Sequence, residues 1–272
     1  MTTSPTLSVS TWSLHRALGR PGFYGPADAR IPAETHGRGA LTLLELPARL
    51  AAFGIRTLEI CHFHLPARDP SYLRALRGAL EAAGVRLFSL LVDDGDVTGP
   101  EAARDLEWIR GWLPVATVLG AERVRVIAGK SEPSEETLAR SVAALEGLAA
   151  DAASSGLRLM TENWFALLSR PDTVLALLDR LEGRVGLCLD FGNWGGEGKY
   201  ERLAAIAPRA ESCHAKAHFV APNAPDREDY TRCLELTRAA GFSGPYTLIY
   251  DGPGDDEWAG LSLERELVRP FL

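Results

Sequence analysis

The chain has 272 residues, of which 46% are hydrophobic and 24% are charged, and its formal net charge is -7. This length suits one large α/β barrel or two small domains, and the composition is ordinary for a soluble globular protein. The acidic balance disfavours binding to nucleic acid, for which Lys and Arg supply most of the affinity, and no apolar run approaches the roughly 20 residues of a membrane helix. We therefore expect neither a nucleic acid nor a membrane as partner.

Four cysteines are scattered along the chain without a C-x-x-C pair: Cys61, Cys188, Cys213 and Cys233. Three of them lie in apolar strand-like runs or in a helical stretch, which favours buried and reduced thiols. The first ten residues, MTTSPTLSVS, lack the basic start and the apolar stretch of a signal peptide. We expect a cytoplasmic protein.

Short apolar runs with strand character alternate with longer helical stretches. The runs cover residues 7–12, 55–61, 85–92, 121–128, 157–162, 185–190, 211–216 and 246–251. Five of them follow a glycine that we expect to end a helix in the left-handed conformation, at or near Gly54, Gly84, Gly120, Gly156 and Gly244. Between the runs, stretches such as 137–153 are rich in Ala and Leu, which are strong helix formers.

Eight such β-α units in 272 residues average about 34 residues each, which is the usual size for a closed (β/α)8 barrel. An open doubly wound sheet normally has fewer units, and no G-x-G-x-x-G follows the first strand. No linker or composition break marks a second domain. We predict an α/β fold in which residues 1–272 form a single TIM barrel.

One connection is long. Residues 14–40 follow the first predicted strand and are rich in Gly, Pro and Arg. Loops of this length are uncommon in compact domains and are usually functional or disordered. Because the loops after barrel strands frame the active-site face, we expect this segment over that face, either as a lid or as an insertion without a role.

Three polar motifs stand at the ends of three successive apolar runs. They are Thr161-Glu162-Asn163, Leu189-Asp190-Phe191-Gly192-Asn193 and Cys213-His214-Ala215-Lys216. Parallel strands joined by helices bring such ends together on one rim. The carboxylates of Glu162 and Asp190 and the imidazole of His214 then form a candidate site for one divalent metal ion.

These motifs, together with LEICHFHLP (58–66) and LLVDDGDVTG (90–99), resemble the xylose isomerase-like TIM barrels. This family includes sugar phosphate isomerases and epimerases, and the AP endonuclease family 2 is related to it. The resemblance spans nearly the whole chain, and it rests on the order and spacing of the motifs because each of them alone is weak. It implies a metal-dependent enzyme that acts on a small sugar-like molecule.

In this family a Glu, an Asp, a His and a final Glu hold one divalent cation. The resemblance implies that Glu162, Asp190 and His214 are the first three ligands and that the ion is Mn, Mg, Co or Zn. The fourth position is filled by Ile249, which cannot bind a metal. Asp251 faces the same side by strand alternation, so it either reaches the metal from one pleat higher or is a loop carboxylate before Gly252-Pro253.

The missing ligand also bears on the mechanism that the resemblance implies. Ketose 3-epimerases of this type use two metal-bound glutamates, one to remove a proton and one to return it. Only Glu162 is present here, so we expect it to be the base of a one-base enolisation, an aldose–ketose shift or a β-elimination. Lys216 either donates to developing negative charge or acts as a base if burial lowers its pKa.

Other polar and aromatic side chains follow the predicted strands and are candidates for contacting substrate. Each has a structural alternative: the aromatic rings can pack, His62 and His64 have the H-x-H spacing of a second metal site, Asn163 can orient Glu162, and Asn193 can shape the turn at Gly192. The candidates are Trp12, His15, His62, His64, Asn163, Asn193 and His218.

We interpret the chain as a divalent-metal-dependent isomerase or epimerase that acts on a sugar or a related hydroxy-carbonyl compound through a metal-stabilised enediolate. The alternatives are a metal-dependent dehydratase or lyase for a polyol or keto acid, and a barrel that binds a small molecule without catalysis. A DNA-repair endonuclease would need a trinuclear zinc site, which six histidines and a net charge of -7 disfavour. The sequence leaves open whether the sugar is phosphorylated and whether Trp108 and Trp112 pack or mark a homo-oligomer interface.

Overall fold

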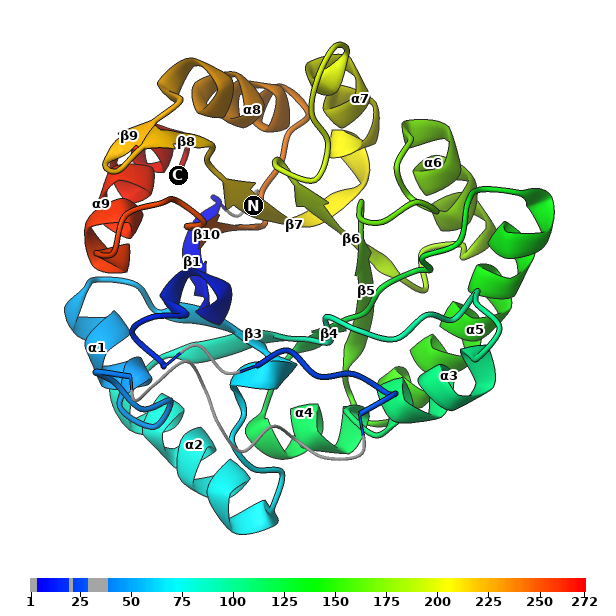
Figure 1. Ribbon diagram of the computed structural model, residues 1–272, viewed down its shortest axis with the longest axis horizontal. Helices are drawn as coiled ribbons and strands as arrows, with labels where there is room; N and C mark the ends of the chain where they lie inside the picture. Colours follow the sequence, from blue (N-terminus) through cyan, green and yellow to red (C-terminus); the bar gives the residue numbers. More distant parts are fainter. Residues whose placement is uncertain (1–3, 20–21, 29–38) are drawn as a thin grey trace.

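The computed structural model describes residues 4–19, 22–28 and 39–272. Within these ranges, parallel strands close into a barrel in the order β1-β10-β7-β6-β5-β4-β3-β2 (Figure 1). The strands are β1 (Thr6–Ser10), β2 (Thr57–Cys61), β3 (Arg86–Leu91), β4 (Arg123–Arg125), β5 (Arg158–Glu162), β6 (Gly186–Asp190), β7 (Ala210–Lys216) and β10 (Pro245–Ile249). Every predicted strand is present, and the single (β/α)8 barrel is confirmed.

Helices surround the barrel and bury their apolar faces against its outer side (Figure 1). In α2, for example, Leu73, Leu76 and Leu80 recur at helical spacing and are buried, and the Asp69 side chain caps the first turn. The helices are α1 (Leu46–Ala52), α2 (Pro70–Ala83), α3 (Ala102–Arg110), α4 (Leu113–Leu119), α5 (Glu135–Ser154), α6 (Pro171–Arg180), α7 (Lys199–Ile206), α8 (Arg227–Ala239) and α9 (Glu257–Val268).

The glycine turns agree with the sequence at four of the five predicted places. Gly54, Gly84, Gly120 and Gly156 all have positive φ angles. Before β10 the left-handed residue is Gly241 rather than Gly244. Gly244 is needed for a different reason, because a Cβ there would lie 2.1 Å from the carbonyl oxygen of Glu211.

The barrel interior is apolar at its middle and charged at both ends. Phe88, Met160 and Cys188 form a small buried cluster inside the barrel, separate from the larger core between strands and helices. Below it, at the amino ends of the strands, the Glu211 carboxylate lies 2.7 Å from the guanidinium groups of both Arg123 and Arg158. This ion cluster closes one end of the barrel.

The described part of the long loop after β1 lies against the segments that follow β2 and β3. A 3-10 helix, η1 (Thr11–Leu14), continues β1, and the buried Tyr24 ring packs against His62 and Trp112. The predicted loop, residues 14–40, includes 20–21 and 29–38, which lie outside the described residues. Whether the loop acts as a lid stays a prediction.

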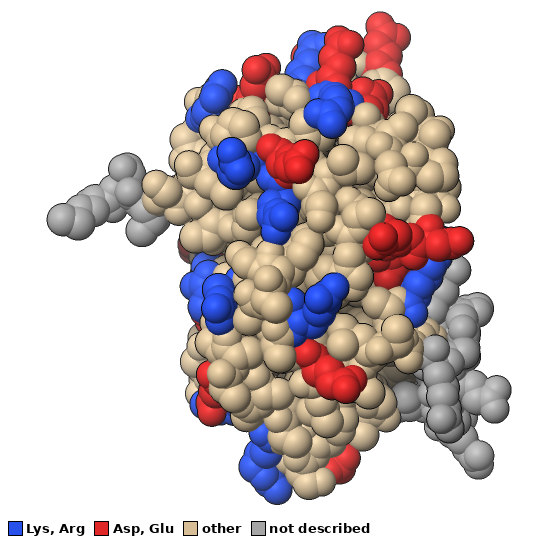
Figure 2. Space-filling model, turned by 90° about the vertical axis from the view of Figure 1, so that its left-hand side faces the viewer, with Lys and Arg blue, Asp and Glu red and all other residues tan. Residues whose placement is uncertain are grey.

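The outer surface carries charges of both signs. On the face in Figure 2, basic and acidic side chains are interspersed rather than gathered by sign. None of the described helices combines the length and hydrophobicity needed to cross a bilayer. Trp112 is buried, and Trp108 packs against it and against His62, so packing accounts for the contacts of both indole rings.

Candidate metal centre and active site

The ends of β5, β6 and β7 meet at the carboxyl end of the barrel, where they border a cavity of about 260 Å³. Strand pairing sets Asp190 on β6 beside His214 on β7, and Glu162 on β5 beside Cys188 on β6. The register thus brings together the three side chains predicted as metal ligands. The cavity is lined by Ser10, Trp12, Cys61, Leu91, Asp93, Arg125, Glu162, Trp164, Asp190, Asn193, His214, Lys216 and Ile249.

The imidazole of His214 lies among carboxylates. Its Nε2 is 2.8 Å from Oε2 of Glu59, and its Nδ1 is 3.3 Å from Oε2 of Glu162 and 3.7 Å from Oδ2 of Asp190. Burial works against the charged ring, but the neighbouring Cys188, Glu162 and Glu59 raise the pKa of His214 well above its ordinary value. A cation bound at Nδ1 would replace a proton there, while Nε2–H would still donate to Glu59.

Glu162 is held from two sides. Nε of Arg125 lies 3.1 Å from Oε2, and the Asn193 side-chain amide donates to Oε1 at 2.6 Å. Burial works to raise the pKa of Glu162, but Arg125 and His214 outweigh it and keep the pKa below its ordinary value. Within the described residues, Oε2 is buried and still accepts no hydrogen bond of acceptable geometry. Such an oxygen needs an explanation, and a bound cation supplies one.

The turn after β6 fixes Asp190. Its Oδ1 accepts backbone hydrogen bonds from Gly192 at 2.6 Å and from Asn193 at 2.8 Å, which leaves Oδ2 facing His214. A Cβ at Gly192 would lie 2.7 Å from Cδ of Lys216, so a larger residue there would displace that side chain. Asn193, for which shaping this turn was the structural alternative, takes part in the turn through its N–H and also donates to Glu162.

The end of β10 differs from the family pattern. Ile249 lines the cavity at the position implied for the fourth ligand. The carboxylate of Asp251 is 48% exposed and pairs with Nζ of Lys216 at 2.7 Å. Burial works to lower the pKa of Lys216, but Asp190 and Asp251 raise it above its ordinary value. Lys216 is therefore protonated, which favours the donor role over the base role.

The residues predicted to contact substrate do not all line the same cavity. Trp12 and Asn193 line the 260 Å³ cavity, as does Trp164, whose ring lies 5.5 Å from the Arg125 guanidinium. His218 borders a neighbouring cavity of about 420 Å³ that also reaches Lys216. Asn163 lies behind the site, where its amide donates to the Asp190 carbonyl at 3.1 Å and accepts from the Asp190 N–H at 2.7 Å.

The other three histidines predicted to contact substrate belong to an aromatic cluster next to Trp12. His62 is fixed by the Asp93 N–H, which donates to Nδ1 at 3.1 Å, and by its own Nε2, 2.8 Å from the Tyr24 carbonyl. Burial keeps the pKa of His64 well below its ordinary value, so this ring is neutral. The ring of His15 lies 5.0 Å from those of both Trp12 and His64. His15, His62 and His64 are not among the residues lining the 260 Å³ cavity.

Comparison with known proteins agrees with this architecture. The family model of the xylose isomerase-like TIM barrel matches residues 47–265, which is most of the chain. The chain belongs to this family. No curated protein matches it by sequence.

Solved structures with the same fold align over nearly the whole chain. The chain is similar to a D-allulose 3-epimerase from Methylomonas sp. at 18% identity and a TM-score of 0.70, with 99% of each chain covered. It is similar to an L-ribulose 3-epimerase at 17% identity and a TM-score of 0.70, covering 98% of this chain and 94% of that one. A xylose isomerase-like TIM barrel protein from Mycobacterium smegmatis, solved with magnesium, aligns at 15% identity and a TM-score of 0.70, with 98% and 96% covered. At these identities, the likeness shows the fold.

Three residues of this family member, Glu59, Arg125 and Cys188, lie at the site without having been assigned a role there from the sequence. Glu59 contacts His214, and Arg125 joins Glu162 to Asp93, whose Oδ1 lies 2.5 Å from the Arg125 Nη2. Cys188 is the partner of Glu162 in the strand register. Glu59 stands in the middle of β2 and Arg125 at the end of β4, so the available signal was strand alternation, which turns every second side chain into the barrel.

Proposed function

We propose that this chain is a divalent-metal-dependent isomerase or epimerase for a sugar or a related hydroxy-carbonyl compound. The observation that carries the proposal is the His214 ring, whose Nε2 contacts Glu59 while Nδ1 faces Glu162 and Asp190. Carboxylate oxygens and an imidazole nitrogen suit Mn, Mg, Co or Zn. The similar D-allulose and L-ribulose 3-epimerases, and a similar barrel solved with magnesium, support this assignment.

The charges around the cavity also favour a cation. Glu59, Asp93, Glu162 and Asp190 are all buried carboxyl groups, and the buried guanidinium beside them is that of Arg125. The ammonium of Lys216 is already paired with Asp251. A divalent ion near Glu162, Asp190 and His214 would reduce this excess of acidic groups.

The residues of the chain define a proton pathway for this chemistry. A divalent ion held by Glu162, Asp190 and His214 supplies Lewis-acid polarisation of a substrate carbonyl. The Glu162 carboxylate, kept ionised by Arg125, removes the proton from the adjacent carbon. Because Ile249 offers no second carboxylate, Glu162 also returns the proton, and it does so to the neighbouring carbon, which gives an aldose–ketose shift. Trp12 and Trp164 line the cavity and give a sugar ring apolar walls.

A dehydratase is the second candidate, and Lys216 favours it. Its ammonium is protonated and lies at the edge of the cavity, so it can donate a proton to a departing hydroxyl group after Glu162 has removed the proton from carbon. This β-elimination needs one base and one acid, which are the two groups that the site offers.

The test is a substrate screen in deuterated water. Metal-free protein is loaded with one of Mn, Mg, Co or Zn at a time and given ketoses, aldoses, inososes or hydroxypyruvate, and proton NMR follows each mixture. An isomerase or epimerase gives a rearranged product with deuterium next to the carbonyl, whereas a dehydratase gives a product lacking one water. Glu162→Gln should abolish both signals. A chain that binds no metal, or that exchanges no proton in any mixture, would contradict the proposal and favour a binding barrel.

A further inference from the structure

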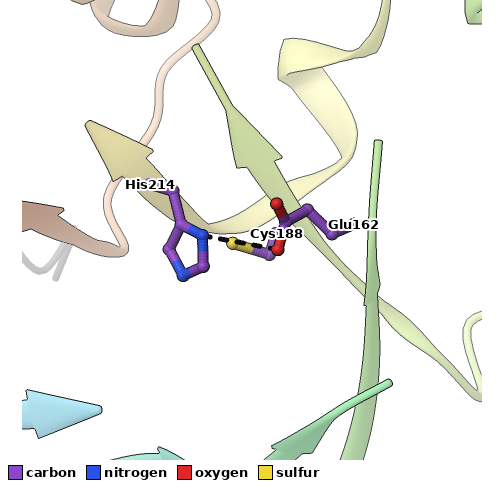
Figure 3. Close-up of side chains that lie close together, drawn as sticks. All are labelled: Glu162, Cys188 and His214. Atoms are coloured by element: carbon purple, nitrogen blue, oxygen red, sulfur yellow. Dashed lines mark ion pairs between the residues drawn. The ribbon is translucent and has the colours of Figure 1, made fainter. Parts of the chain in front are cut away.

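Cys188 lies at the candidate metal centre, although its sequence context predicts only a buried thiol. Its Sγ, a carboxylate oxygen of Glu162 and a ring nitrogen of His214 all lie within 4.8 Å of one another. Figure 3 shows the three side chains pointing toward one another from β5, β6 and β7. In the part of the chain that the structure describes, no other three or more potential ligand residues meet this spacing.

We propose that Cys188 is a metal ligand, and that with Glu162 and His214 it binds a thiophilic divalent ion, Zn²⁺ foremost. The inference rests on the proposed metal-dependent function and specifies its ion. In this set Cys188 replaces Asp190 as the third ligand of the proposed function, and Asp190 stays beside the ion with Oδ1 used by the turn and Oδ2 near His214.

A second observation points to the same space. Oε2 of Glu162 is buried and accepts no hydrogen bond of acceptable geometry, although Arg125 and His214 lie within 3.3 Å of it. The Glu162 side chain is 5% exposed, so water does not satisfy this oxygen from the surface. An anionic oxygen in this position gains a partner when a cation binds between it, the sulfur and the ring nitrogen.

The donor set decides which ion the site prefers. One thiolate, one imidazole and one carboxylate make three protein ligands, which is the number that catalytic zinc sites use while they keep a further position for water or substrate. Thiolate sulfur favours Zn²⁺ and Co²⁺, whereas Mg²⁺ and Mn²⁺ favour sites made of oxygen. The Glu59 carboxylate on Nε2 of His214 orients the ring, as carboxylates commonly do behind a zinc-bound histidine.

The test uses the full chain, stripped of metal and titrated with Co²⁺. A thiolate ligand gives an intense near-ultraviolet sulfur-to-cobalt charge-transfer absorption. The wild-type protein should show this absorption at one equivalent of ion, and Cys188→Ser should lose it. The matched control is Cys213→Ser, because Cys213 is also fully buried on a barrel strand but belongs to the core outside the barrel. It should behave as the wild type.

Zinc affinity gives the second readout. Cys188→Ser should weaken Zn²⁺ binding by at least about 100-fold and change Mg²⁺ binding by less than about threefold, because only the soft donor is lost. Should Cys188→Ser not fold, X-ray absorption of the wild-type zinc protein still decides, since one sulfur neighbour is expected. Tight binding of Co²⁺ without the charge-transfer absorption, or of Zn²⁺ with only oxygen and nitrogen neighbours, overturns the inference and leaves the proposed function standing. Failure to bind any of these ions overturns both.

Discussion

The two ends of this barrel both hold buried charges, but they hold them differently. At the amino end, Glu211 contacts Arg123 and Arg158, so one carboxylate meets two guanidinium groups at 2.7 Å. At the carboxyl end, Glu59, Glu162 and Asp190 surround His214, and Glu162 shares the buried guanidinium of Arg125 with Asp93. The amino end therefore pairs its carboxylate with two guanidinium groups, whereas at the carboxyl end carboxyl groups outnumber guanidinium groups and Oε2 of Glu162 accepts no hydrogen bond.

The difference separates stability from function within one fold. The ion pairs at the amino end connect neighbouring strands, which is a structural role. An excess of acceptors costs stability, so it persists where a ligand or a reaction uses it. In TIM barrels, the active site lies at the carboxyl end of the strands. Exchanging single charges at the two ends tests this division.

The largest effect is expected for Glu162→Gln at the carboxyl end. The amide cannot accept a proton from carbon, so kcat should fall about 1,000-fold, within the range for loss of a general base. The melting temperature should also fall, because the ionised Glu162 pairs with the buried Arg125, so the rate is measured well below the melting transition. Rate and thermal denaturation measured on the same preparation check both expectations. A variant with full activity would remove Glu162 from the mechanism.

Asp93→Asn should have the next largest effect, on stability. Burial works to raise the pKa of Asp93, but Arg125 and His62 lower it to about 2. A folded-state pKa below the unfolded value of about 3.9 gives stability that is present above pH 4 and is lost as the pH falls toward 2, worth about 2 kcal/mol. The variant should lose this amount at pH 7, and its unfolding free energy should depend less on pH between 4 and 2. Urea titrations at several pH values measure it, and an unchanged acid dependence would contradict the assignment.

The sequence allowed the barrel to be predicted because each strand is a short apolar run after a helical stretch. In addition, a glycine that ends a helix precedes several of these runs. Glu162, Asp190 and His214 could be found because each stands at the end of its strand. Contacts across the barrel could not be found in this way. Glu59 contacts His214 although 155 residues separate them in the sequence. That contact depends on the stagger of the strands in the closed barrel.

Cys188 illustrates the same limit of local patterns. A cysteine in the run VGLCLD is predicted to be a core residue. Some of its neighbours are indeed apolar, namely Phe88 and Met160. Only the register that pairs Cys188 with Glu162 brings its sulfur to the carboxylate and the imidazole. That register is set by the packing of neighbouring strands rather than by any residue in the run.

At the amino end, Glu211→Gln is the counterpart of Glu162→Gln. It leaves Arg123 and Arg158 without their carboxylate, and we expect a loss of about 1 to 2 kcal/mol in unfolding free energy, since partial exposure lets water screen the charges. The side chains are 22%, 35% and 31% exposed for Arg123, Arg158 and Glu211. Activity should stay within about twofold of the wild type, because the chemistry of TIM barrels takes place at the other end. Loss of activity without loss of stability would show that the two ends are coupled.

The smallest effect is expected for Ile249→Glu, which adds a further carboxylate to the carboxyl end and so enlarges the difference in charge between the two ends of the barrel. Ile249 is 4% exposed and lines the cavity, so the new group would join Glu162, Asp190 and His214. Mn²⁺ and Mg²⁺ should bind about tenfold more tightly, because hard cations prefer oxygen ligands. Without metal, the variant should be less stable than the wild type, since the added charge is buried among acidic groups, and saturating Mn²⁺ should restore the loss.

Ile249→Gln is the matched control, with nearly the same shape and no charge. It should gain little metal affinity, and added Mn²⁺ should not raise its melting temperature beyond that of the wild type. Calorimetric titration and thermal denaturation with and without Mn²⁺ separate the two variants. If Ile249→Glu binds Mn²⁺ no better than Ile249→Gln does, the cation does not lie within reach of β10. The cation would then be held by Glu162, His214 and their neighbours on β6 alone.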